Sequence, residues 1–456
     1  MEFPAEPFRI KVVERIRQTT RDERELVLKH AGMNVFNIPS GAIYVDLLTD
    51  SGTSAMSDHQ WAALNIGDES YAGSRSFYKL ESAVRDITGF PHVIPAHQGR
   101  VAENLLFSAI CGPHKVVPNN THFDTTRANV EANRGEALDF PLPEALDPAR
   151  EHPFKGNMNV PALEKFLSER AVDVPMVVMT VTNNSAGGQP VSMQNIRETS
   201  RVCKKYGVRF FIDCARYAEN CWFIHEREPG YKGKEIIAIA RELFSYADGC
   251  WMSSKKDALV NIGGFIAMKD AALTQTLQQK LILIEGFPTY GGLAGRDLEA
   301  IAVGLYEGLD PDYLHYRTSQ VRYLGETLAA AGVPIVHPVG GHAVFIDAKN
   351  FCSHLPQSQF PGVALTVALY REAGIRGVEI GSLMFAHQDK HNGRTVYPAL
   401  ELVRLAIPRR VYTSAHMTYV AESIIKIFEN RQSLRGLQLT YEAPILRHFT
   451  AQLEEV

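Results

Sequence analysis

The sequence is poor in cysteine and contains no long apolar run. Its six cysteines form no Cys-X-X-Cys pair, so their spacing predicts neither a disulfide framework nor a paired-cysteine metal site. No stretch of about 18 apolar residues is present, which argues against a membrane-spanning helix. The first residues, MEFPAEPFRIKVVERIR, lack the apolar core of a secretory signal. We therefore expect a cytoplasmic protein with reduced cysteines and no membrane partner.

An excess of charge of one sign is also lacking. The chain has 47 Lys and Arg residues against 51 Asp and Glu residues, a formal net charge of −4. Nothing in this balance indicates a surface for nucleic acid. The 16 histidines form no recognisable metal-site motif. A chain of 456 residues, 45% hydrophobic and 21% charged, is typical of a soluble globular protein, and its length predicts two domains.

The middle of the chain alternates short apolar runs with a helical pattern. Apolar runs cover residues 176–181, 208–212 and 264–268, and a helical stretch, 192–206, separates the first two. Strand–helix–strand alternation predicts a mostly parallel sheet covered by helices. The fold class is therefore α/β in this part of the chain.

The pattern changes after residue 309. An amphipathic stretch, 313–331, precedes GVPIVHPVGGHAVFIDA, which has two β-like runs around a Gly-Gly turn. We expect a large α/β domain at 48–311 and a smaller α+β domain formed by 19–47 and 312–456. Residues 1–18, with Pro4 and Pro7, read as an extended arm before a helix near residues 21–32.

A lysine in MSSKKD, residues 252–257, is the strongest candidate for covalent chemistry. The amine of a lysine can be held neutral and condensed with a carbonyl as a Schiff base, and a hydroxyl-rich turn suits such a lysine. The alternative is a solvated turn with two surface lysines.

An aspartate ends the apolar run of FFIDCAR. Asp213 is thereby placed at the carboxyl end of a parallel strand, where such folds bind ligands. A carboxylate there could keep the ring nitrogen of pyridoxal phosphate (PLP) protonated, which makes the ring an electron sink. The alternative is that Asp213 caps the next turn.

Three further motifs supply groups that PLP and an amino acid would need. His97-Gln98-Gly99-Arg100 precedes a helical run and predicts a phosphate seat at a helix N-terminus, although it also fits a plain helix start. Asn184, in a turn after a strand, could bind the ring hydroxyl or serve turn chemistry alone. Arg404, inside LVRLAIPRR, predicts either a partner for a substrate carboxylate or a structural ion pair.

These signals follow one another in the order phosphate turn, Asn, Asp, Lys, Arg, and longer segments extend the pattern. The chain resembles the aromatic β-eliminating lyases, the family of tryptophanase and tyrosine phenol-lyase, almost from end to end. The segments that carry the resemblance include GDESYAGSRSFY, PAHQGR, NSAGGQPVS, FIDCARYAEN, FSYADGCWMSSKKDALVNIGG and LVRLAIPRRVYT.

The resemblance implies a PLP-dependent fold of the aspartate-aminotransferase type, a homotetramer and a monovalent cation, usually K⁺. It assigns the Schiff base to Lys256, the pyridinium partner to Asp213 and the substrate carboxylate to Arg404. Tyr71 would be the acid near the leaving group, contributed across a subunit interface. The implied cofactor residues are Gln98, Gly99, Arg100, Phe123, Asn184, Asp213, Arg216, Ser253, Lys255 and Lys256, and the implied cation residues are Gly52, Glu69 and Asn261. Val101 departs from the family, which often has a second glycine there.

Three residues favour cleavage of L-tryptophan to indole, pyruvate and ammonia. Asp124 stands where tyrosine phenol-lyase typically has Thr, and Ile380 stands where that enzyme has an Arg for the phenol. His448 matches tryptophanase, while Asp124 also fits a helix cap. Asp124 and His448 are therefore counted as catalytic, and the remaining residues of the expected substrate pocket are Phe36, Thr49, Ile380 and Phe449.

Other features favour different functions. Segments 261–264 and 295–297, and the near absence of a long insertion before Asn119, look more like tyrosine phenol-lyase. That activity, which converts L-tyrosine to phenol, pyruvate and ammonia, is the alternative. A non-catalytic PLP-binding sensor is a more remote one, because such a protein would usually carry a basic DNA-binding module.

Overall fold

The computed structural model describes residues 5–389, 393–444 and 446–456, and its chain forms two compact units. The central unit consists of residues 51–145 and 153–315. The terminal unit combines the described residues of 1–50 and 316–456 with the segment 146–152. The predicted large domain, 48–311, has ends close to those of the central unit. It wrongly included 146–152, which joins the terminal unit because the His337 backbone N–H donates a 2.7 Å hydrogen bond to the Pro148 carbonyl.

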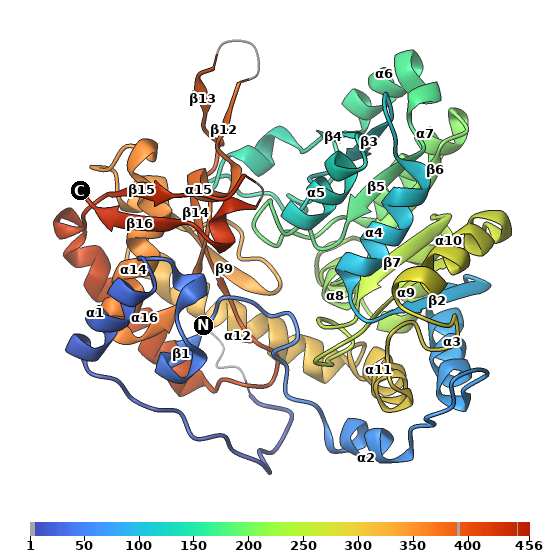
Figure 1. Cartoon of the computed structure of the whole chain (residues 1–456), viewed down its shortest axis with the longest axis horizontal. Coiled ribbons are helices and arrows are strands. Elements are labelled where there is room, and N and C mark those ends of the chain that lie inside the picture. Colours follow the sequence, from blue (N-terminus) through green and yellow to red (C-terminus); the bar gives the residue numbers. More distant parts are fainter. Residues whose placement is uncertain (1–4, 390–392, 445) are drawn as a thin grey trace. The chain divides into compact units, whose positions relative to one another are not determined.

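A five-stranded sheet forms the core of the central unit (Figure 1). β5, β6 and β7 are parallel, and β8 runs antiparallel to both of its neighbours, β7 and β2. The sheet is mostly parallel, as predicted, and the three predicted apolar runs form β5, β6 and β8. In spatial order the strands are β2 (His92–Ala96), β8 (Gly264–Met268), β7 (Gly249–Ser253), β6 (Arg209–Asp213) and β5 (Met176–Thr180).

Helices cover both faces of this sheet because its strands are apolar on both sides. On one face, Val178, Phe211 and Ile266 pack with residues of α4 and α10, and on the other face Val177 and Ile212 pack with residues of α7, α9 and α11. The helices of the central unit include α2 (Asp58–Ile66), α3 (Arg75–Thr88), α4 (Gly99–Ile110), α5 (Asp124–Ala132), α6 (Val160–Arg170), α7 (Met193–Lys205), α8 (Tyr217–Arg227), α9 (Ile236–Ser245), α10 (Ala271–Ile284) and α11 (Gly295–Glu307). A parallel pair, β3 (Val116–Asn119) and β4 (Glu136–Asp139), completes it.

The terminal unit is built on an antiparallel sheet of β11 (Val378–Ile380), β14 (Leu402–Ala406) and β9 (Ala343–Asp347), in that order. Of the two β-like runs predicted around the Gly-Gly turn, the second forms β9. The first makes only an isolated bridge at Ile335, because Pro334 and Pro338 have no N–H to donate to a ladder.

Helices from both ends of the sequence pack in the terminal unit, and α1 lies beside α14 (Figure 1). α1 (Arg21–His30) begins with a capping box formed by Thr20 and Glu23. The other elements include α12 (Pro311–Ala330), of which residues 316–330 belong to this unit, α13 (Ala348–Phe351), α14 (Pro361–Ala373), α15 (Ser382–Phe385), α16 (Ser414–Glu429), and the paired strands β1 (Val45–Asp46) with β10 (Ile375–Arg376), β12 (His387–Gln388) with β13 (Thr395–Val396), and β15 (Leu437–Tyr441) with β16 (Gln452–Glu455).

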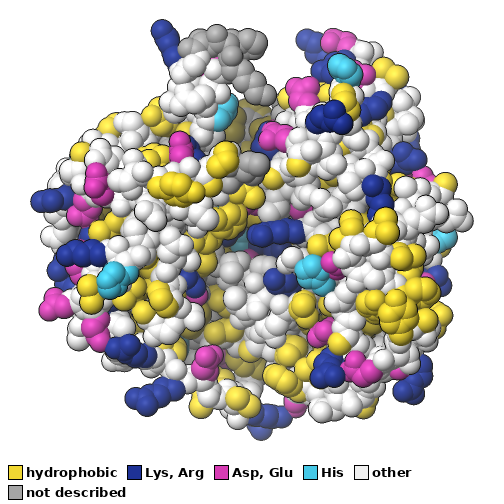
Figure 2. All heavy atoms as spheres, viewed as in Figure 1, with side chains coloured by type: hydrophobic (Ala, Val, Ile, Leu, Met, Phe, Trp, Pro, Cys, Tyr) yellow, Lys and Arg dark blue, Asp and Glu magenta, His cyan; other side chains and the backbone are white. Residues whose placement is uncertain are grey.

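The surface carries charges of both signs. On the face drawn in Figure 2, Lys and Arg side chains are interspersed with Asp and Glu side chains and with apolar side chains. Residues 5–18 of the predicted arm contain neither helix nor strand, and its first four residues lie outside the described part of the chain. Within the described ranges, none of the helices has both the length and the apolar character that crossing a membrane requires.

Candidate active site

The carboxyl ends of parallel strands bring the predicted cofactor residues of the central unit together. β6 ends at Asp213, β7 ends at Ser253, and the turn that contains Asn184 follows β5. β2, which runs in the same direction, leads into Gln98 and α4. The site therefore forms at one edge of the sheet, where open α/β sheets bind ligands.

The start of α4 provides an anion seat. Gln98 is the N-cap residue, and Gly99 lies so close to Ser253 that a Cβ at Gly99 would stand 2.7 Å from the Ser253 Cβ. Two cations, Arg100 and Lys255, come from the flanking segments. Burial and the Arg100 charge lower the pKa of Lys255, as expected for two cations near one another. Helix N–H groups with two basic side chains suit a phosphate group.

Lys256 and Asp213 lie on neighbouring segments. The backbone N–H of Asp257 donates to the Ala215 carbonyl at 3.3 Å, and the Ala215 N–H donates to Asp213 Oδ1 at 3.3 Å. Burial raises the pKa of Asp213, while the charges of Lys256 and Arg216 lower it. Arg216 is buried and is the N-cap residue of α8. A protonated pyridine nitrogen beside Asp213 would be one more cation that favours its ionised form.

Three more of the predicted cofactor and leaving-group residues of the central unit lie in the turn after β5 and at the start of α5. Asn184 is buried in a turn that Gly187 and Gly188 allow through positive φ angles of 94° and 68°. Phe123 is the N-cap residue of α5 and Asp124 is its first residue. Asp124 is therefore not the N-cap itself, but its Oδ1 accepts a hydrogen bond of 2.6 Å from the Thr125 backbone N–H, so a structural role at the start of α5 stays open.

Glu103 is an acidic residue of this region that the sequence analysis missed. It is buried on α4 and accepts a 2.6 Å hydrogen bond from the Thr126 hydroxyl. Burial, followed by the neighbouring Asp213 charge, raises the pKa of Glu103 to about 7. The available signal was one acid inside the apolar run VAENLLF, but its partners lie on other elements and could not be read from the sequence.

The predicted cation residues are only partly brought together. Asn261 Nδ2 donates to the carbonyls of Gly52 and Ser54 at 3.0 and 3.2 Å. Glu69 instead forms an exposed ion pair of 2.8 Å with Arg296. Within the described residues, no three His, Cys, Asp or Glu side chains are grouped as they would be around a metal ion.

Tyr71, the predicted acid, is 70% exposed in the single chain. Its ring packs on Phe287 and Tyr290 at centroid distances of 5.8 and 5.3 Å, and a hydrogen bond with Tyr290 raises the pKa of Tyr71. An exposed tyrosine with fixed ring contacts can be presented to another subunit, as the prediction requires.

Residues of the predicted substrate pocket also gather within the terminal unit. The rings of His448 and Phe449 lie 4.1 Å apart, and Phe36 lies 5.9 and 4.9 Å from them. Phe36 packs against the apolar cluster that contains Ile380. Thr49, a residue of the same unit, is half-buried.

Arg404 occupies the same face of the terminal sheet as Ile380. It pairs across the strands with Val378, and its Nη2 donates to the Leu48 carbonyl at 3.1 Å. Only 7% of Arg404 is exposed, so this face carries a nearly buried cation beside an apolar surface. Such a cation suits a carboxylate partner.

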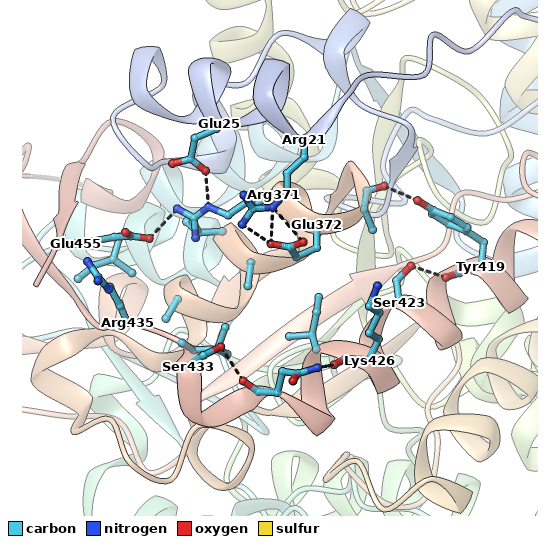
Figure 3. Close-up of a pocket in the computed structure, with 18 residues that line it drawn as sticks. Arg21, Glu25, Arg371, Glu372, Tyr419, Ser423, Lys426, Ser433, Arg435 and Glu455 are labelled. Carbon is cyan, nitrogen blue, oxygen red and sulfur yellow. Dashed lines mark hydrogen bonds and ion pairs between the residues drawn. The ribbon is translucent and has the colours of Figure 1, made fainter.

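A separate hollow of the terminal unit, of about 650 Å³, is lined by α1, α14, α16 and β15 (Figure 3). Its charges are largely neutralised within it. Arg371 pairs with Glu25 and Glu455, each at 2.6 Å, and Arg21 pairs with Glu372 at 2.9 Å. None of the predicted site residues lines it, so it is not part of the candidate active site.

Known proteins resemble this chain in sequence and in fold. The family model described as beta-eliminating lyase matches residues 46–423. A tryptophanase from Hyphomonas neptunium is 54% identical over 100% of both chains, and a tyrosine phenol-lyase from Pasteurella multocida is 52% identical over 99% of both chains. A solved serine palmitoyltransferase from S. paucimobilis with bound PLP and myriocin has a TM-score of 0.56 at 14% identity, over 85% of this chain and 87% of that one. The predicted fold class is confirmed.

Proposed function

The chain belongs to the beta-eliminating lyase family, and from that premise we propose that it is a PLP-dependent enzyme that cleaves L-tryptophan. The balanced reaction joins tryptophan and water and releases indole, pyruvate and ammonia. The observation that carries PLP dependence is the arrangement in the central unit, where an anion seat, a buried carboxylate and a lysine stand at the same edge of the sheet, after β2, β6 and β7.

PLP, when bound, supplies the electron sink for the reaction. In the proposal, Gly99, Arg100 and Lys255 hold its phosphate, and Lys256 forms the covalent link. Asp213 keeps the ring nitrogen protonated, and burial supports this role because a buried carboxylate gains most from a nearby cation. Arg404 binds the substrate carboxylate through its guanidinium group. Lys256 would also move the proton of the substrate Cα.

The leaving group needs a proton on its ring carbon before it can depart. Tyr71 is the proposed donor of that proton. Asp124 would accept the indole N–H, whose acidity increases as the ring is protonated, so the interaction strengthens toward the transition state. His448 and Ile380 would contact the indole ring. Ile380 offers no hydrogen-bond donor to a phenol oxygen, and this residue is the observation that favours tryptophan.

Tyrosine is the second candidate substrate. Its support is that curated relatives of both activities match the whole chain at 52–54% identity. In that case the products would be phenol, pyruvate and ammonia, and Asp124 would serve only to bind a backbone N–H at the start of α5.

We further propose a homotetramer in the cytoplasm, with K⁺ bound near Gly52, Asn261 and Glu69. Oxygen ligands suit a hard cation, and the Gly52 carbonyl lies beside Asn261. The K⁺ site is tested by comparing PLP affinity and turnover in K⁺ and in Na⁺. Equal values in both salts would contradict it.

One experiment tests the function directly. The purified protein is incubated with PLP and either tryptophan or tyrosine, and the aromatic product is identified. Indole from tryptophan, at a higher kcat/KM than phenol from tyrosine, is the expected result. Borohydride reduction and peptide mapping should place the pyridoxyl group on Lys256. A preference for tyrosine would contradict the substrate proposal, and PLP binding without either product would favour a sensor.

A further inference from the structure

Two buried glutamates lie behind the sheet face that carries Ile380 and Arg404. Side chains alternate between the faces of a strand, so Glu379 on β11 points to the face opposite Ile380. Glu401 directly precedes β14 and shares the face of Glu379, because it lies two residues before Val403, the cross-strand partner of Glu379. Glu379 is 5% exposed and Glu401 is 1% exposed.

Each carboxyl group is held by one of its oxygens. Glu379 Oε1 accepts a 2.9 Å hydrogen bond from the Leu383 backbone N–H. Glu401 Oε2 accepts from the Ser382 backbone N–H at 3.0 Å, from the Ser382 hydroxyl, and from Gln357 Nε2 at 3.2 Å. The carboxyl groups thereby hold the first N–H groups of α15, the short helix that follows Ile380.

The other oxygen of each group, Glu379 Oε2 and Glu401 Oε1, is buried. The backbone N–H groups of Met384 and Gly362 also interact with Glu379 and Glu401, respectively. A Cβ built on Gly381 would stand 2.6 Å from Glu401 Oε1 and 3.0 Å from Glu379 Oε1, and one on Gly362 would also approach both side chains. The two carboxyl groups therefore flank the same position beside Gly381. Two full negative charges so placed, out of water, would be very costly.

We propose that Glu379 and Glu401 share one proton, and that this acid pair positions the strands that present Ile380 and Arg404. The shared proton halves the charge that the two buried carboxyl groups would otherwise carry. The positioning role rests on the proposed function, since it concerns the residues that would meet the substrate. The shared proton does not rest on that function.

The surroundings fit a single negative charge. Burial, and then the neighbouring Glu401, raise the pKa of Glu379 well above its ordinary value, and burial raises the pKa of Glu401. The charged or titratable groups facing the pair are Arg447 and the Cys352 thiol. Arg447 donates its N–H groups to the carbonyls of Ser382, Leu383 and Ala386 and to Glu442.

Infrared spectroscopy of the holoenzyme near neutral pH tests the shared proton. We expect a carbonyl band of a buried carboxylic acid that shifts in D₂O and is missing from both Glu379→Gln and Glu401→Gln, because an amide can donate to the remaining carboxylate. Glu422→Gln, which changes an exposed residue of α16, should keep the band. Identical spectra of the wild type and Glu379→Gln would overturn the proposal. So would thermal stability that depends on K⁺ without such a band, since a cation would then bridge the pair.

The Glu103→Gln chain, which lacks the separate buried carboxyl group whose pKa is about 7, keeps the proposal testable if either variant fails to fold. Its band should disappear as the pH is raised while the protein stays folded, and a band independent of pH up to unfolding would overturn the sharing. For the positioning role, we expect loss of the shared proton at high pH to raise the KM of the wild type. The factor by which KM rises should be several times the factor by which kcat falls. Glu379→Gln should lack this pH dependence, and equal pH profiles would overturn that role. Failure to form indole would leave the band unchanged, so the two proposals fail separately.

Discussion

Glu103 is a buried acid whose pKa lies near neutrality, at about 7, against an ordinary value of 4.5. A folded-state pKa above the unfolded value means that folding takes up a proton between those values. Stability from this group is therefore complete below about pH 4.5 and is lost as the pH rises through about 7. The full effect is on the order of 3 kcal/mol.

Replacing Glu103 by Gln should flatten this pH dependence, because an amide still accepts the Thr126 hydroxyl but carries no charge. We expect the free energy of unfolding of the wild type to fall more steeply between pH 5 and 8 than that of Glu103→Gln, measured by denaturant titration at several pH values. The exposed Glu169 on α6 supplies a control, since Glu169→Gln should follow the wild type. Parallel curves for the wild type and Glu103→Gln would show that Glu103 ionises normally.

Asp124 decides between a role in substrate choice and a role in helix capping. If its carboxylate accepts the indole N–H, Asp124→Thr should lower kcat/KM for tryptophan roughly ten- to hundredfold. This corresponds to a loss of about 1–3 kcal/mol of transition-state stabilisation. An amino acid with a good non-aromatic leaving group should be affected much less, because it offers no indole N–H. Steady-state kinetics on both substrates make the comparison. An equal loss on both would assign Asp124 to the start of α5 alone, since Thr can also cap a helix.

The place of the candidate site in the fold was predictable where a candidate residue stands at the end of an apolar run. Asp213 ends a buried strand in FFIDCAR and Lys256 follows one in MSSKKD, and parallel strands bring such ends to one edge. Glu103 and the Glu379–Glu401 pair were not predictable. Their properties come from burial and from partners on distant segments, and the sequence shows neither.

The N-terminus of α4 packs closely against the end of β7, and this packing leaves no room for a side chain at Gly99. A Cβ there would meet the Ser253 Cβ at 2.7 Å and its backbone at 3.1–3.2 Å, so the α4 N-terminus would have to move away from β7. Gly99→Ala should lose about 1–3 kcal/mol of stability through overpacking. It should also weaken PLP binding at least about tenfold, because misplaced N–H groups lose hydrogen bonds to the phosphate.

Gly112, just beyond the end of α4, is the matched control for Gly99. A Cβ at Gly112 meets no atom within 4 Å, so Gly112→Ala should leave PLP affinity and stability near their wild-type values. Fluorescence titration of the apoenzyme with PLP and thermal unfolding measure both effects. Wild-type PLP affinity in Gly99→Ala would mean that the phosphate is held elsewhere.

Elements were predicted best where local pattern and tertiary packing agree. The helices near 21–32, 192–206 and 313–331 form as expected, with Thr20 and Ser192 as N-caps of the first two. The antiparallel direction of β8 was not predictable, since a fully buried strand reads the same in either direction. The run before β9 looked like a strand from its apolar residues, but its prolines limit it to one bridge.

At the scale of the whole molecule, the terminal unit is assembled from both ends of the chain and from the inserted segment 146–152. Its boundaries could be placed only approximately from composition, because the hydrogen bond that joins Pro148 to His337 links residues far apart in sequence. The environment of Tyr71 also depends on the proposed oligomer. Tyr71 is exposed in the single chain, yet it is proposed to donate a proton in a closed site.

Mixing two inactive variants tests whether Tyr71 acts across a subunit interface. Tyr71→Phe and Lys256→Ala should each be inactive alone. In a symmetric pair in which Tyr71 serves the neighbouring site, a mixed dimer unites the intact Lys256 of one chain with the intact Tyr71 of the other. Random mixing makes about half of the pairs mixed, each with one intact site, so we expect roughly a quarter of the wild-type turnover. If Tyr71 served the site of its own chain, every site in the mixture would carry one defect. No recovered activity after subunit exchange, with mixed assemblies verified by native mass spectrometry, would therefore rule out the proposed exchange of Tyr71 between subunits.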